Sequence, residues 1–203
     1  MEHFATEVLA YIRAHPEMAA LVIGLTAFGE SFAFVSFLFP GFAIMVAAGA
    51  LVEAGLIDPI PAALAGFAGA VLGDAISYWL GLKFGHVLPR LWPFSRNPAA
   101  LEAGVAFFNR WGWPSVFVGR FFGPLRAFVP LAAGMCRMPA VPFYVANITS
   151  AAVWAPALLF SGYLIGTIAA NGWSIETKAL AAGAALVVFA GLVWLSKKIF
   201  KAG

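Results

Sequence analysis

A strongly apolar stretch, residues 117–134, carries charges and prolines that an ordinary membrane-spanning helix does not contain. Arg120 and Arg126 lie in it, and Pro124 and Pro130 interrupt it. An arginine in the middle of a membrane costs about 3 kcal/mol on an insertion scale. Interrupted backbone is tolerated at membrane depth only where protein or a water-filled cavity covers it. We therefore expect this stretch to line a cavity and to hold two positive charges inside the membrane.

The composition places the whole chain among integral membrane proteins. Of its 203 residues, 63% are hydrophobic and only 10% are charged, whereas soluble domains carry about 25% charged residues. The net charge of +3 collects in loops and at the C-terminal end, a pattern typical of membrane orientation rather than of nucleic-acid binding. One cysteine and three histidines without ligand spacing offer no metal site. Neither a metal, a cofactor nor a nucleic-acid partner is expected.

Several segments can be assigned from length and periodicity. A bilayer crossing takes about 20 apolar residues, and three runs are long enough for one: residues 60–84, 143–170 and 178–196. Residues 2–15 are predicted to form an amphipathic helix that lies either in the membrane interface or against the bundle. The polar segment 86–112 should contain a short helix from Pro98 to Trp111, and its excess of basic residues predicts a cytoplasmic location.

Residues 19–57 form a further apolar run that is too long for one span and has no polar loop for two. The run contains Glu30 and is broken at Pro40 and Gly41. A re-entrant hairpin fits this pattern, with a half-helix to about Phe37, a turn at Pro40 and Gly41, and a second half-helix that returns. A full span followed by a half-span is the alternative.

The sequence predicts one all-α membrane domain built from two halves with the same order of elements. Each half is a re-entrant hairpin followed by a span, residues 19–85 and 113–170, and residues 1–18 form the N-terminal helix. The second hairpin has its turns at Pro124 and Pro130. If the basic loop 86–112 lies in the cytoplasm, the two halves have opposite orientations in the membrane. Such inverted repeats are common in secondary transporters. The C-terminal span then ends in the cytoplasm.

Four ionisable side chains lie within the apolar stretches: Glu30, Asp74, Arg120 and Arg126. Placed singly in the membrane they would cost on the order of 10 kcal/mol, so mutual pairing is expected. Because guanidinium forms paired hydrogen bonds with phosphate, Arg120 and Arg126 are candidates for binding an anionic group. Glu30 and Asp74 are candidates for proton coupling or for charge pairing. Salt bridges that only hold the helices together are the alternative for all four.

Other residue types give weaker signals. The serines in the apolar runs have no histidine at comparable depth, so no enzyme activity is expected. Glycines spaced four apart, Gly81 with Gly85 and Gly162 with Gly166, are predicted to be helix-packing sites. Such small-residue faces would also permit a homodimer without requiring one.

Several motifs occur together between residues 20 and 168. In the first half they are Glu30 before Phe39-Pro40-Gly41, and Gly73-Asp74 before Tyr78, Gly81 and Gly85. In the second half they are Gly119-Arg120-Phe121 with Pro124, Arg126, Pro130 and Gly134, and Gly162-Tyr163 before Gly166. This set resembles the DedA family, which is similar to the eukaryotic lipid scramblases of the VTT-domain class. One position departs from the family pattern, because Phe42 stands where many relatives have an acid.

The resemblance implies a multi-pass protein of the bacterial inner membrane that works as a lipid flippase or scramblase. Its cargo would be undecaprenyl phosphate or a phospholipid such as phosphatidylethanolamine, and its partners would be membrane lipids and protons. Two other functions stay open. One is a proton-coupled carrier of a small ion or osmolyte. The other is a non-transporting scaffold, in which neutralising Glu30 and Arg120 together should preserve function.

Overall fold

The structure is a computed structural model that describes residues 2–36, 41–90, 94–96, 98–122 and 126–170. Within these ranges every regular element is a helix and no strand occurs, so the predicted all-α class is confirmed. The predicted C-terminal span, residues 178–196, lies outside the described residues.

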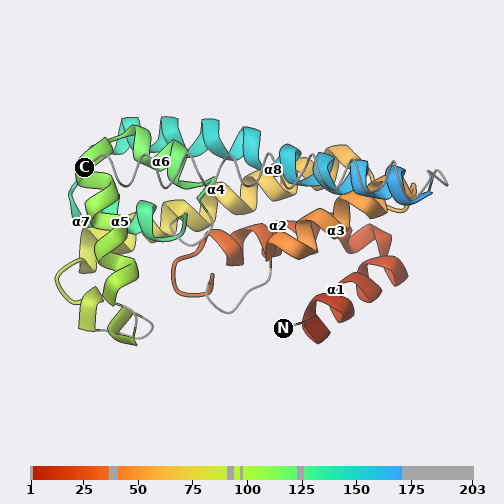
Figure 1. Ribbon diagram of the computed structural model, residues 1–203, viewed down its shortest axis with the longest axis horizontal. Coiled ribbons are helices and arrows are strands. Elements are labelled where there is room, and N and C mark those ends of the chain that lie inside the picture. The colour runs from red at the N-terminus through yellow and green to blue at the C-terminus, as the bar shows by residue number, and fades with distance from the viewer. Residues whose placement is uncertain (1, 37–40, 91–93, 97, 123–125, 171–203) are drawn as a thin grey trace.

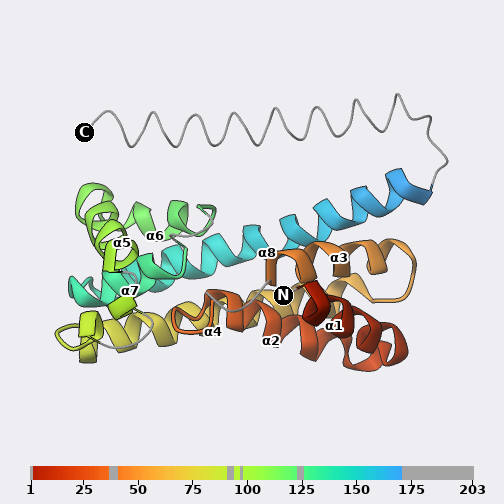
Figure 2. The same cartoon turned by 60° about the horizontal axis from the view of Figure 1, so that its bottom comes forward.

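Two long helices run along the molecule, and the shorter helices lie beside them (Figure 1; Figure 2). They are α4 (Pro59–Phe84) and α8 (Ala140–Ala170), which pack on each other. By length and composition both can cross a membrane, and they confirm the helices predicted at residues 60–84 and 143–170. Asp58 caps α4, because its carboxylate accepts a hydrogen bond of 3.1 Å from the backbone N–H of Ile60.

The first broken stretch contains two helices of equal length. α2 (Ala19–Ser31) and α3 (Gly41–Glu53) have 13 residues each, about 20 Å of helix, which is less than the thickness of a bilayer core. α2 ends at Ser31, earlier than the expected end near Phe37. The physical reason is a tertiary contact, since the backbone N–H of Ala33 donates to Ser77 Oγ of α4 at 3.0 Å instead of continuing the helix.

The second broken stretch also contains two short helices. α6 (Pro114–Gly119) ends just before Arg120, and α7 (Phe128–Met135) begins after the break. Pro130, expected at a hairpin turn, lies in the first turn of α7, where its missing N–H leaves no intrahelical bond unmade. Of the other expected turn residues, Gly41 is the first residue of α3, and Pro40 and Pro124 lie outside the described residues.

The remaining helices lie at the two ends of this assembly. α1 (Glu2–Ala14) is near α2 and α3, whereas α5 (Pro98–Trp111) lies beside α6 and α7 at the opposite end (Figure 1). α5 has the bounds that the sequence predicted. Three short 3-10 turns complete the described elements: η1 (Pro16–Met18), η2 (Leu88–Arg90) and η3 (Phe94–Arg96).

Glycines let α3 and α7 each approach the long helix of the other half. A Cβ atom added at Gly49 of α3 would lie 2.9 Å from the Cα atom of Gly162 of α8, and one at Gly81 of α4 would lie 3.1 Å from the Cα atom of Gly134 of α7. α3 therefore packs on α8 and α7 on α4, whereas α2 packs on α4 within its own half. Gly81 and Gly162, which the sequence offered for helix packing or a dimer, are occupied by contacts within the chain.

Candidate functional site

The structure brings together all four ionisable residues of the apolar stretches. They form two ion pairs, Arg120 with Asp74 and Arg126 with Glu30. Asp74 lies in α4 and Arg120 directly after α6, whereas Glu30 lies in the last turn of α2 and Arg126 in the break before α7. Each pair therefore joins the two halves of the chain.

The first pair is enclosed in a polar network. Besides its bond to Asp74, the Arg120 guanidinium donates to Ser150 Oγ through Nε at 2.9 Å and to Asn147 Oδ1 through Nη2 at 2.6 Å. Asn147 in turn donates to the carbonyl of Val71 at 3.1 Å. The side chains of Arg120 and Asp74 are only 3% and 4% exposed. A desolvated arginine with this many partners is held firmly in one position.

The second pair has fewer partners and more access. Arg126 Nη2 pairs with Glu30 Oε1, and the Arg126 side chain is 16% exposed while that of Glu30 is 1% exposed. Glu30 Oε2 has no hydrogen-bond partner among the described residues. That oxygen lies against the start of α3, since a Cβ atom added at Gly41 would be 2.5 Å from it.

One aromatic ring connects the two pairs. The guanidinium carbons of Arg120 and Arg126 lie 6.0 Å and 5.6 Å from the centroid of the Trp154 ring, within the range of cation–π attraction. Trp154 is a buried residue of α8. Sequence reasoning did not connect it with the charges.

Asn147 and Ser150 were also missed by sequence reasoning. A signal was present, because Asn147, Ser150 and Trp154 are spaced three and four residues apart and so share one face of α8. Polar residues within an apolar span usually face the interior of a helix bundle. The expected double neutralisation of Glu30 and Arg120 also needs correction, since the structure pairs Glu30 with Arg126. Only the distances in the folded chain decide which acid meets which arginine.

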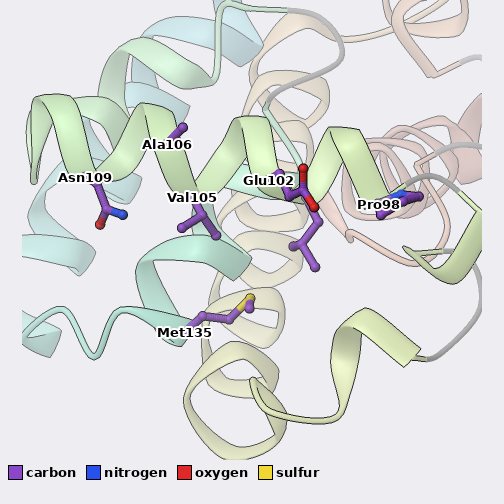
Figure 3. A pocket seen from close by; sticks show the side chains of 7 residues that line it. Pro98, Glu102, Val105, Ala106, Asn109 and Met135 are labelled. Atoms are coloured by element: carbon purple, nitrogen blue, oxygen red, sulfur yellow. The ribbon is translucent and has the colours of Figure 1, made fainter.

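A separate groove lies between α5 and the end of α7 (Figure 3). It has a volume of about 340 Å³ and is lined by α5 side chains from Pro98 to Asn109 and by Met135. Its lining is mostly apolar, and among the described residues it includes none of the four paired charges. The ion pairs, and not this groove, form the candidate functional site.

Comparison with known proteins gives consistent relatives. Residues 39–164 match the sequence profile of the VTT domain. The chain is 34% identical to the inner membrane protein YabI of Escherichia coli, over 100% of this chain and 78% of that protein. It is 30% identical to an uncharacterized membrane protein of Buchnera aphidicola, over 98% of this chain and 75% of that protein. An uncharacterized membrane protein of Mycobacterium tuberculosis is 35% identical, over 78% of this chain and 73% of its own length. No solved structure matches the chain significantly.

Proposed function

The chain belongs to the VTT-domain family of membrane proteins, the DedA family, and from this we propose that it moves a phosphate-bearing lipid across the bacterial inner membrane. Undecaprenyl phosphate and phospholipids such as phosphatidylethanolamine are the proposed cargoes. The observation that supports the proposal best is the Glu30–Arg126 pair, a buried acid bonded to a partly exposed arginine between the two halves. Charged groups at this depth are costly and mark substrate or ion pathways.

The two arginines have different parts in this proposal. Arg126 contacts the lipid phosphate, because its exposed edge is open to a ligand and guanidinium suits phosphate oxygens. Arg120 keeps its position through Asp74, Asn147 and Ser150, and it serves as an anchor beside the site. The acyl or prenyl chains stay in the bilayer throughout.

Protons enter the proposal through Glu30. A phosphate that binds Arg126 competes with the Glu30 carboxylate for the same guanidinium. A proton on Glu30 removes that competition, so lipid binding and proton uptake would be linked. Asp74, by contrast, remains bonded to Arg120 through the cycle.

We propose that the two broken stretches are re-entrant hairpins of an inverted repeat. α2 and α3, at 13 residues each, are too short to cross a bilayer individually, and α3 and α7 pack on the long helix of the opposite half through close glycine contacts. In this topology the C-terminus is cytoplasmic. Single-cysteine labelling from each side of right-side-out vesicles, in a Cys136→Ser background, tests it. A hairpin enters and leaves the membrane on one side. If positions in α2 are labelled from one side and positions in α3 from the other, the hairpin is overturned.

The function is tested with purified protein in lipid vesicles. A fluorescent phosphatidylethanolamine and a fluorescent polyprenyl phosphate are placed in the vesicles, and the fraction reached by an external quencher is followed with time. We expect the parent protein to move at least one of them and Arg126→Ala to reduce the rate about tenfold or more, the loss of one charge-assisted contact. Arg110→Ala, which removes an exposed arginine of α5, is the matched control.

Folded Arg126→Ala protein that moves both lipids at the parent rate would overturn the proposal. The same vesicles loaded with a pH-sensitive dye test the carrier alternative. Proton flux driven by a soluble ion, without lipid movement, would favour that alternative.

A further inference from the structure

We propose that the N-terminus of α3 is the second half of the anion site, and that the Glu30 carboxylate is its resident occupant. In this arrangement the phosphate group of the substrate takes the place that the carboxylate now fills, between α3 and Arg126. The inference rests on the proposed function, because that function supplies the phosphate. It adds a binding element from the first half of the chain to the arginine from the second.

The first observation is the position of the carboxylate. A Cβ atom added at Gly41 would lie 2.5 Å from Glu30 Oε2 and 2.9 Å from Glu30 Cδ. Gly41 is the first residue of α3 and is itself buried. The carboxylate therefore lies against the first residue of this helix, where a side chain at position 41 would collide with it.

The second observation concerns unpaired polar groups at the start of α3 and on Glu30. The first N–H groups of a helix have no intrahelical acceptor, and the helix dipole places about half a positive charge there. Glu30 Oε2 is buried and has no hydrogen-bond partner among the described residues. An unpaired buried carboxylate oxygen is costly. The oxygen lies beside the first residue of a 13-residue helix without a hydrogen bond from it, and such a helix end attracts anions.

The third observation is the opposite side of the carboxylate. Glu30 Oε1 bonds Arg126 Nη2, so the two carboxylate oxygens face an arginine from the second half and a helix end from the first. A phosphate group has the same negative charge and more acceptor oxygens, and it would satisfy both partners at once. Two anions do not fit in one place, so Glu30 and phosphate occupy the site alternately.

The test measures phosphate binding to the purified full-length chain in detergent. Inorganic phosphate and dioleoylphosphatidic acid are the two probes, titrated by calorimetry and by native mass spectrometry. We expect Glu30→Gln, which removes the competing charge, to bind about tenfold more tightly than the parent. Glu102→Gln, which removes an exposed acid of α5, should leave the affinity unchanged. Tightening for phosphatidic acid alone identifies a lipid headgroup as the ligand, and tightening for both probes identifies the free phosphate group. Either result supports the site.

A glycine substitution gives an independent arm if Glu30→Gln does not fold. Gly41→Ala places a methyl group where the anion lies and should weaken binding about tenfold. The matched control is Gly66→Ala, where the added Cβ meets mainly the flexible end of Met45, 3.1 Å away, and binding should not change. Unchanged phosphate affinity in both Glu30→Gln and Gly41→Ala, or unchanged affinity in the one that folds, would overturn the inference.

The outcomes distinguish failure of this inference from failure of the proposed lipid transport. If Arg126→Ala stops lipid movement while the Glu30 and Gly41 variants bind phosphate like the parent, the transporter stands and the α3 site does not. If those variants change phosphate affinity as expected while Arg126→Ala still moves lipid, the α3 site stands and the transport role of Arg126 does not.

Discussion

The two buried ion pairs use the same chemistry in different surroundings. Arg120 has three side-chain partners from two long helices, and its side chain is 3% exposed. Arg126 has one described ion-pair partner, and its side chain is 16% exposed. A buried group with several partners gains little from a ligand, whereas a more exposed group with fewer partners can exchange them. The comparison supports the proposal that the Arg120 pair is an anchor and that the Arg126 pair exchanges its partner.

Chain position explains the difference. Arg120 follows α6 directly and reaches the faces of α4 and α8, where Asp74 and Asn147 already lie. Arg126 stands in the break before α7 and reaches Glu30 in the last turn of α2, a short helix that packs on α4. Arg120 therefore has partners on both long helices, whereas the one described partner of Arg126 lies on a short helix.

The largest expected effect concerns the enclosed pair. Asp74→Ala leaves the Arg120 guanidinium buried without its counter-charge, which should lower the free energy of unfolding by about 3–5 kcal/mol. Asp74→Asn keeps a hydrogen-bond acceptor and should cost less. Chemical denaturation in detergent measures both. If Asp74→Ala is as stable as the parent, the network is not an anchor and the comparison fails.

The next prediction compares stability and lipid movement in variants of the two arginines. Arg126→Ala leaves the buried Glu30 without its counter-charge and should cost about 3 kcal/mol. Arg120→Ala should cost more, because it removes bonds to three side chains. The rate of lipid movement should fall more in Arg126→Ala than in Arg120→Ala, when both are measured at a temperature where both variants are folded. Equal losses of stability and of transport in the two variants would show that the pairs have the same role.

A smaller effect is expected at the neutral members of the network. Asn147→Ala and Ser150→Ala each remove one bond to Arg120 and should lower the free energy of unfolding by about 1.5–3 kcal/mol, with little change in lipid movement. Thr149→Ala is the control on the same helix, because the Thr149 hydroxyl is exposed and bonds only the backbone of its own helix. A large transport defect in folded Asn147→Ala protein would place the network within the exchange site.

The sequence predicted the elements better than their contacts. Long apolar runs identified α4 and α8, and Pro98 identified the start of α5, because these signals are local. The end of α2 at Ser31 was not predictable, since it depends on a bond between Ala33 and Ser77 that are 44 residues apart in the chain. The same limit applies to the charges. Their cost in the membrane indicated pairing, but the choice of Arg126 for Glu30 depends on the folded arrangement.

Neutral polar residues explain the rest of what sequence reasoning missed. Placing Asn147 or Ser150 in a membrane helix costs less free energy than placing an arginine or an aspartate there. Composition therefore does not single them out. Only their common face with Trp154 on α8 indicates a cluster. Charged residues therefore located the site, and helical periodicity was needed to find the residues that complete it.

The smallest expected effect tests whether the two pairs act independently. Trp154 faces both guanidinium groups at 6.0 Å and 5.6 Å, and each contact is worth about 1 kcal/mol. Trp154→Leu should cost more stability than Trp154→Phe, which keeps an aromatic face. A double-mutant cycle of Trp154→Leu with Arg126→Ala, measured by chemical denaturation, isolates the contact at the exchanging pair, and the matching cycle with Arg120→Ala isolates the anchored one. Coupling of about 0.5–1 kcal/mol in both cycles would mean that one ring stabilises both guanidinium groups, whereas coupling in the Arg120 cycle alone would make Trp154 a further part of the anchor.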